Sequence, residues 1–145
     1  TMQAAITAAE TGHLVFSTLH TTSASQTIDR IIDVFPPYQQ PQIRSQLSIT
    51  LQGVITQKLL KRTDLKGRIP TTEILVVTPA VRNMIRESKT HQIYSAIEMG
   101  MEYGMHTMEQ NLNELLSKRI IKWEDAYAVA SMADYIKQLE SGNSK

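Results

Sequence analysis

The order of sequence patterns over the first 35 residues places the strongest constraint on the fold. Apolar residues recur at helical spacing over residues 2–9, and Gly12 stands where a glycine commonly follows a helix. The continuous apolar run at 14–16 is typical of a strand buried on both faces. Ser23 and Gln26 then match the capping box of a second helix. Helix, buried strand, turn and helix in this order predict an α/β domain.

A hairpin of two strands is predicted further along the chain. Residues 54–60 and 71–78 are rich in apolar and β-branched side chains, and the turn residues 64–67 lie between them. The first of these segments could instead extend a helix that is predicted from near Pro41. The strand-like character of the second segment favours the hairpin, because a strand needs a neighbour.

Past Thr78 the sequence shows only helical patterns. Thr78 is suited to cap a helix that Pro79 begins, and Thr107 with Gln110 matches a second capping box. The last helical pattern ends near residue 139. The sequence therefore divides into an α/β part, a helical lobe and a frayed tail, at residues 1–78, 79–140 and 141–145.

The composition excludes several classes of protein. The chain has 145 residues, no cysteine and a formal net charge of +1, so disulfide scaffolds, cysteine zinc sites and thiol nucleophiles are excluded, and nothing favours a nucleic-acid partner. No apolar run reaches the ~18 residues of a transmembrane segment, and no secretory signal is present, so we expect a cytoplasmic location. The sequence also contains no glycine-rich phosphate-binding loop.

Two histidines bracket the predicted strand. The odd offset between His13 and His20 points their rings to opposite faces of a regular strand, so the two cannot both ligate one metal ion without a distortion, and no metal site is predicted. His20 lies with Thr18 and Thr21 at the carboxyl end of the strand, where α/β sheets bind ligands. The alternative is a turn histidine that hydrogen-bonds to backbone.

A short charged helix is the second candidate site. Arg82 and Arg86 share one helical face, with Asn83 and Glu87 beside them. Like charges at this spacing cost a helix roughly 0.2–0.5 kcal/mol, which favours an acidic partner. The alternative is an ordinary solvated face. We expect Arg82, Asn83 and Arg86 to face outward, on a fold that does not need them.

The motifs together resemble a known family. Residues 10–22, ETGHLVFSTLHTT, resemble the His box of the secretion-type ATPases, the ring motors of type II secretion and type IV pili. Residues 81–87, VRNMIRE, are similar to the signature helix of the retraction branch, the PilT-type twitching motility ATPases. Further segments similar to the family are residues 26–36 and 67–75, and further segments similar to that branch are 104–108 and 124–126.

The resemblance implies a fold and a function. The parent protein would be a RecA-like P-loop ATPase that assembles as a homo-hexamer, uses ATP and Mg²⁺, and powers pilus retraction and twitching motility. It would act on the cytoplasmic side of the inner membrane at the pilus base, where a pilus platform protein is its partner. The family's Walker A, Asp box and Walker B motifs precede the His box. The chain would therefore be a C-terminal part that begins just after Walker B and is inactive alone, without bound ATP or Mg²⁺.

The resemblance also assigns roles to the candidate residues. His20 would be catalytic near the γ-phosphate of ATP, with His13, Thr18 and Thr21 close to the nucleotide. The signature helix with Arg82, Asn83, Arg86 and Glu87 would couple hydrolysis to a partner.

Two alternatives stay open at this point. A pilus extension or type II secretion ATPase is the first, but those motors generally carry a tetracysteine zinc subdomain between the paired strands. This chain has only the turn at 64–67 there and no cysteine. The second is a non-enzymatic helical adaptor that binds an acidic partner through the face of Arg82 and Arg86.

Overall fold

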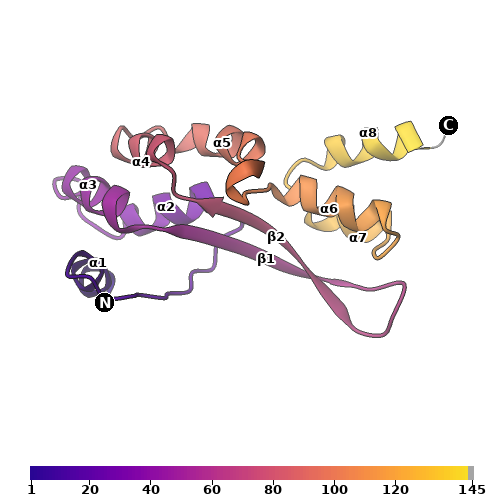
Figure 1. Ribbon diagram of the computed structural model, residues 1–145, viewed down its shortest axis with the longest axis horizontal. Helices are drawn as coiled ribbons and strands as arrows, with labels where there is room; N and C mark the ends of the chain where they lie inside the picture. The colour runs from indigo at the N-terminus through magenta and orange to yellow at the C-terminus, as the bar shows by residue number, and fades with distance from the viewer. Residues whose placement is uncertain (144–145) are drawn as a thin grey trace.

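The computed structural model describes residues 1–143 as a set of helices around one β-hairpin. The elements in chain order are α1 (Met2–Glu10), α2 (Ala24–Asp33), α3 (Gln40–Thr50), β1 (Gly53–Lys61), β2 (Arg68–Val76), α4 (Pro79–Arg86), η1 (Thr90–Gln92), α5 (Ile93–Met99), η2 (Met101–Tyr103), α6 (Met108–Ser117), α7 (Trp123–Val129) and α8 (Ala133–Asn143). In Figure 1, α2 to α5 gather over one end of the hairpin, and α6 to α8 lie toward the other end.

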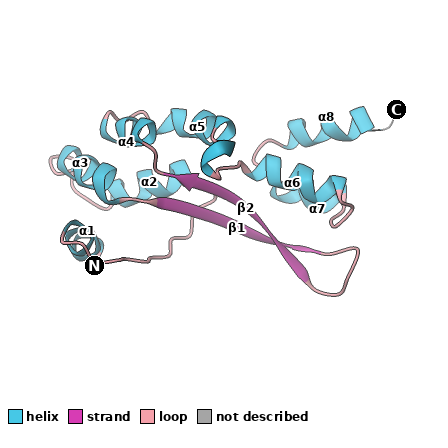
Figure 2. Ribbon diagram, in the orientation of Figure 1, coloured by secondary structure: helices cyan, strands magenta, loops and turns pink. Residues whose placement is uncertain are grey.

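The predicted hairpin is confirmed. Strands β1 and β2 pair antiparallel from Gly53 opposite Val76 to Lys61 opposite Arg68, and together form the two-stranded sheet of the described residues. Figure 2 shows that the two strands twist around each other toward the turn. The backbone of Ile74 also pairs with His106, so the chain that leads into α6 is attached to β2.

The predicted helix starts follow from local side-chain chemistry. The Ser23 hydroxyl accepts a hydrogen bond from the backbone of Gln26, and Thr78 likewise caps α4, which begins at its proline. Thr107 and Gln110 form the complete reciprocal capping box at the start of α6. Each side chain satisfies a backbone N–H that the first turn of a helix leaves without a partner.

The prediction of a buried strand between His13 and His20 is wrong for this chain. Residues 13–20 form neither strand nor helix, and the side chains of Leu14 and Phe16 are 81% and 88% exposed. A strand needs a neighbour to receive its backbone hydrogen bonds. Among the described residues the two strands pair with each other, so the apolar run has no sheet to join.

The buried apolar side chains form two clusters. The first collects residues of α1 to α5 and the near end of the hairpin, and the second collects residues of α6 to α8 with Leu60. The predicted boundary at residue 78 does not coincide with this division, because Val81 and Ile85 of α4 pack in the first cluster. Helix α8 continues to Asn143 within the predicted tail, and residues 144–145 lie outside the described part.

Four buried polar residues lie where one cluster gives way to the other, and we call them the polar layer: Thr71, Glu73, Thr107 and Glu109, each at most 3% exposed. Thr71 and Glu73 lie on β2 between Ile69 of the second cluster and Leu75 of the first, and Thr107 and Glu109 lie at the start of α6. Burying polar groups is unfavourable unless each finds a hydrogen-bond partner. The partners of the polar layer therefore decide how the two clusters are joined.

Candidate functional site

The segment that connects α1 to α2 carries the two predicted histidines at its ends. At the first end, His13 Nδ1 lies 3.2 Å from the carbonyl oxygen of Ala8 and 3.1 Å from Thr11 Oγ1. Gly12 makes the turn with a φ of 91°, which favours glycine. The His13 ring is therefore held against the C-terminal end of α1, whose last carbonyl groups lack partners within the helix.

His20 lies in a different environment. Its side chain is exposed, and among the described residues it has no hydrogen-bond partner. Thr18 is exposed beside it, whereas the Thr21 hydroxyl lies 2.6 Å from that of Thr27 in α2. The structure therefore does not bring Thr21 onto the His20 ring. Within the described residues, no group of three or more histidine or acidic side chains is arranged to hold a metal ion.

The backbone that follows His20 is firmly attached. Both the amide and the hydroxyl of Thr22 donate to Gln26 Oε1, at 3.2 and 2.7 Å. The amide of Ala24, the first residue of α2, donates to Glu73 Oε1 at 2.7 Å. His20 therefore stands free at the end of a segment whose next residues are fixed by side chains of α2 and β2.

Glu73 is a functional candidate that the sequence reasoning missed. Residues 71, 73 and 75 of β2 alternate inward, so Glu73 occupies a core-facing position between a threonine and a leucine. That alternation was the available signal. Burial raises the pKa of the Glu73 carboxyl, the hydrogen bond from Ala24 opposes this rise, and the negative charge of Glu109 adds to it.

The raised pKa of Glu73 predicts a pH-dependent stability. Because the folded state favours the neutral carboxyl, the stability that Glu73 contributes is greatest below its unfolded pKa of about 4.3 and falls as pH rises through the folded pKa. Melting temperatures of the wild type and of Glu73→Gln between pH 4 and 8 test this. The amount by which the melting temperature of the wild type exceeds that of Glu73→Gln should shrink as pH rises. A gap that widened with pH would contradict the prediction.

The predicted partner helix is α4, and its two arginines differ. Arg86 is exposed and donates to the Asn83 side chain one turn earlier, as expected. Arg82 does not face outward: it is half-buried, and its Nη1 donates to the carbonyl oxygens of Ser48 and Ile49, at 3.2 and 2.8 Å. Those carbonyl groups belong to the last turn of α3, where a cation is favourable.

Glu87 ends the same helix at the surface. Its carboxylate lies 2.7 Å from the Lys89 ammonium group, and that hydrogen bond lowers the pKa of Glu87. The exposed part of the signature helix therefore consists of Asn83, Arg86 and Glu87, all outside the two apolar clusters.

The arginine contacts predict unequal effects on stability. Arg82→Ala should lower the free energy of unfolding by about 1–2 kcal/mol, because it leaves the last carbonyl groups of α3 without their charged donor. Arg86→Ala should change it by less than about 0.5 kcal/mol, because an exposed charge contributes little. Urea unfolding of both variants measures the difference. Equal effects would show that Arg82 does not hold α3.

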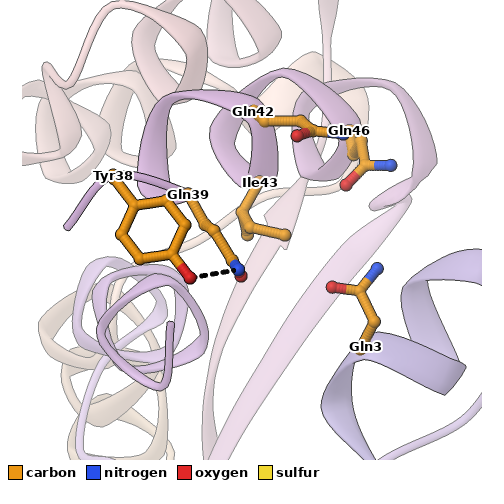
Figure 3. Close-up of a pocket in the computed structure, with 6 residues that line it drawn as sticks. All are labelled: Gln3, Tyr38, Gln39, Gln42, Ile43 and Gln46. Atoms are coloured by element: carbon orange, nitrogen blue, oxygen red, sulfur yellow. Dashed lines mark hydrogen bonds between the residues drawn. The ribbon is translucent and has the colours of Figure 1, made fainter. Parts of the chain in front are cut away.

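Two hollows on the surface lie away from the histidines. Figure 3 shows the first, a cleft of about 350 Å³ between α1 and α3 whose walls carry Gln3, Tyr38, Gln39, Gln42, Ile43 and Gln46. Within it, Gln39 Nε2 donates to the Tyr38 hydroxyl at 3.1 Å. The second is an apolar groove between α4 and α5 lined partly by Met84, Met99 and Met105. None of the predicted nucleotide-proximal residues lines either hollow.

Comparison with known protein families identifies the family to which the chain belongs. The model of the family described as "Type II/IV secretion system protein" matches residues 1–128. The chain belongs to this secretion family. The matched range contains the histidine segment, the hairpin and the signature helix, so the resemblance of these motifs is confirmed.

Curated relatives place the chain within the secretion family. It is 50% identical to the type IV pilus retractation ATPase PilT of Pseudomonas aeruginosa over 134 residues, which are 92% of this chain and 39% of that protein. It is 52% identical to a twitching motility protein of Neisseria gonorrhoeae over 126 residues, 87% of this chain and 34% of that protein. The resemblance to the retraction branch is therefore also confirmed.

Solved structures of related ATPases have folds similar to the fold of this chain. A crystal structure of the pilus retraction motor PilT with bound ADP matches with a TM-score of 0.84 and 43% identity, over 94% of this chain and 38% of that one. The ATPase DotB of Legionella pneumophila matches with a TM-score of 0.74 and 26% identity, over 88% of this chain and 34% of that one. The chain thus spans between about one-third and two-fifths of the length of these relatives. In the described part, no helix combines the length and apolar character needed to cross a membrane.

Proposed function

We propose that the chain is the C-terminal part of a homo-hexameric ATPase that retracts type IV pili and drives twitching motility. The observation that carries the proposal is 50% identity to a PilT protein over 92% of the chain. The absence of cysteine argues against the extension and secretion branches, whose motors generally carry a zinc subdomain at the hairpin.

The proposal extends to the fold of the parent protein. Residues 1–78 would belong to a RecA-like core and residues 79–140 to a helical C-terminal lobe. The exposed apolar side chains of Leu14 and Phe16 support this, because a strand at 13–20 would bury them once neighbouring strands of the parent are present.

ATP would be the substrate of the full-length protein. The described residues do not by themselves fit Mg²⁺-bound ATP, since the chain has no phosphate-binding loop and no cluster of acidic side chains that could hold the ion. Those tasks would fall to residues outside this chain. The contribution of this chain would be His20, a free ring that can donate a hydrogen bond to the γ-phosphate, with His13, Thr18 and Thr21 nearby.

The proposed partner is the pilus platform protein of the inner membrane, with the motor at the cytoplasmic side of the pilus base. The exposed residues Asn83 and Arg86 of α4, with Glu87 directly after the helix, are the proposed coupling surface. Arg82 would act on this surface indirectly, because it fixes α4 against the end of α3.

Genetic removal of the full-length protein tests the proposed function. A retraction motor disassembles pili, so the deletion strain should keep its surface pili and lose twitching, and the wild-type gene should restore motility. Loss of the pili themselves would instead identify an extension motor. Unchanged pili and unchanged twitching would favour the adaptor hypothesis.

The coupling surface can be tested in the same strain. Arg86→Ala should keep the ATPase rate of the purified protein within about twofold and abolish twitching, because the exposed guanidinium contributes little to the fold. Arg119→Ala, which removes another exposed arginine outside α4, is the matched control and should retain motility. Normal twitching with Arg86→Ala would leave this arginine an ordinary solvated side chain.

A further inference from the structure

The Glu73 carboxylate lies between the starts of two helices. It accepts the amide of Ala24 at the start of α2, with 2.7 Å between nitrogen and Oε1, and the backbone of Met108 at the start of α6 is close enough to lower the pKa of the carboxyl. The amide of Ala24 is a first-turn donor that has no partner inside its own helix. Glu73 therefore attaches α2 to β2, and the neighbouring Thr72 of the same strand attaches α6, because its amide donates to Asn111 Oδ1 at 2.9 Å.

Glu109, the other carboxylate of the polar layer, faces away from α2. Its Oε1 accepts the amides of Ser131 and Met132 at 2.8 and 3.0 Å, and its Oε2 accepts the Tyr94 hydroxyl at 3.2 Å. Burial and the Glu109 charge raise the pKa of Tyr94 to about 12, so this hydroxyl stays a donor at neutral pH. Glu109 thus fixes the approach to α8, and Glu73 fixes α2.

Through its hydrogen bond with Ala24, Glu73 can influence residues that lie outside the core. Ala24 follows His20 by four residues, and the intervening chain is held to α2 by Thr22 and Gln26. Any shift at the start of α2 therefore moves the backbone that carries His20. Because α6 is attached to the same strand through Asn111, a shift of β2 would also reach the second apolar cluster.

We propose that Glu73 is a positioning residue, which fixes the start of α2 and thereby the location of His20 relative to the substrate. The effect on the reaction rests on the function proposed above, whereas the attachment of α2 by Glu73 does not depend on that function. Glutamate suits this role, because both oxygens of its carboxyl group can accept hydrogen bonds, and the N-terminus of α2 partly offsets the cost of burial that raises its pKa. Glutamine keeps only one acceptor oxygen, and alanine keeps none.

The first experiment measures the attachment without reference to catalysis. Amide hydrogen exchange is followed in the full-length protein, without nucleotide, for the peptide that covers the start of α2. Exchange there should rise by about 10–100-fold in Glu73→Ala and by less in Glu73→Gln. Glu102→Gln, which removes an exposed carboxylate, is the control and should change nothing. Unchanged exchange in Glu73→Ala would overturn the inference.

The second experiment separates positioning from general stability. Glu109→Gln removes a carboxylate of equal burial that does not touch α2, so it controls for damage to the polar layer. At a temperature where all variants are folded, Glu73→Ala should lower kcat for ATP by about 10–100-fold with KM within about threefold. The kcat of Glu73→Gln should lie between those of Glu73→Ala and the wild type. Glu109→Gln should keep kcat within about threefold of the wild-type value.

The two readouts distinguish the possible failures. Equal losses of kcat in Glu73→Ala and Glu109→Gln would overturn the positioning role, because the polar layer would then act only through stability. A wild-type protein that hydrolyses no ATP would contradict the proposed function. The rise in exchange at α2 would in that case still support the attachment by Glu73.

Discussion

Replacing His20 by alanine in the full-length protein should lower kcat for ATP hydrolysis by about 100–1,000-fold and change KM by less than about threefold. The ring is exposed and has no partner among the described residues, so its removal takes nothing from the fold of this chain. A donor that acts only on charge developing in the transition state contributes to the rate and not to ground-state binding. Steady-state kinetics with ATP measure both constants.

His91→Ala is the matched control for His20→Ala. His91 is likewise an exposed histidine, but it lies in η1, outside the motif that resembles the His box. Its replacement should leave kcat within about twofold. If His20→Ala also stayed within twofold, His20 would be an ordinary surface residue and the catalytic assignment would be lost.

Leu112→Ala should lower the free energy of unfolding by about 2–5 kcal/mol, the largest effect on stability that we expect. Leu112 is fully buried in α6 at the centre of the second apolar cluster, so the change removes apolar contacts and leaves a cavity. The same change at Leu14, which is 81% exposed, should cost less than about 0.5 kcal/mol. Urea unfolding of this chain compares the two variants.

The Leu14 variant also tests the proposed parent fold. If residues 13–20 form a buried strand in the full-length protein, Leu14→Ala should there become as costly as a core substitution, by about 2–5 kcal/mol. Equal, small costs in this chain and in the full-length protein would mean that the segment stays exposed, and the RecA-like assignment of this segment would then fail.

Helix starts were predictable from the sequence because their cause is local. Thr107 and Gln110 are three residues apart, and their reciprocal hydrogen bonds need nothing from the rest of the fold. The strand at 13–20 was predicted from an equally clear pattern, but its outcome depends on partners elsewhere in space. An apolar run indicates that burial of these residues is favourable, but it does not identify the segment that covers them.

The candidate site could be predicted only in part for a related reason. The exposure of Arg86 follows from its position opposite the apolar face of α4, whereas the contact of Arg82 with α3 depends on how two helices cross. Glu73 is harder still, because a single glutamate in a strand is most often a surface residue. Its role depends on the amide of Ala24, 49 residues earlier in the chain.

These long separations have a consequence for the order in which the chain assembles. The paired strands β1 and β2 are neighbours in sequence, so the hairpin closes a short loop, on a timescale of roughly 1–10 μs. The bond from Ala24 to Glu73 and that from Lys58 Nζ to the carbonyl oxygen of Val129 span 49 and 71 residues. Closing each of these longer loops costs more conformational entropy, so we expect the hairpin to form while the Glu73 carboxylate is still hydrated. We then expect the two halves of the core to meet on a strand already in place, with the dehydration of Glu73 late in folding.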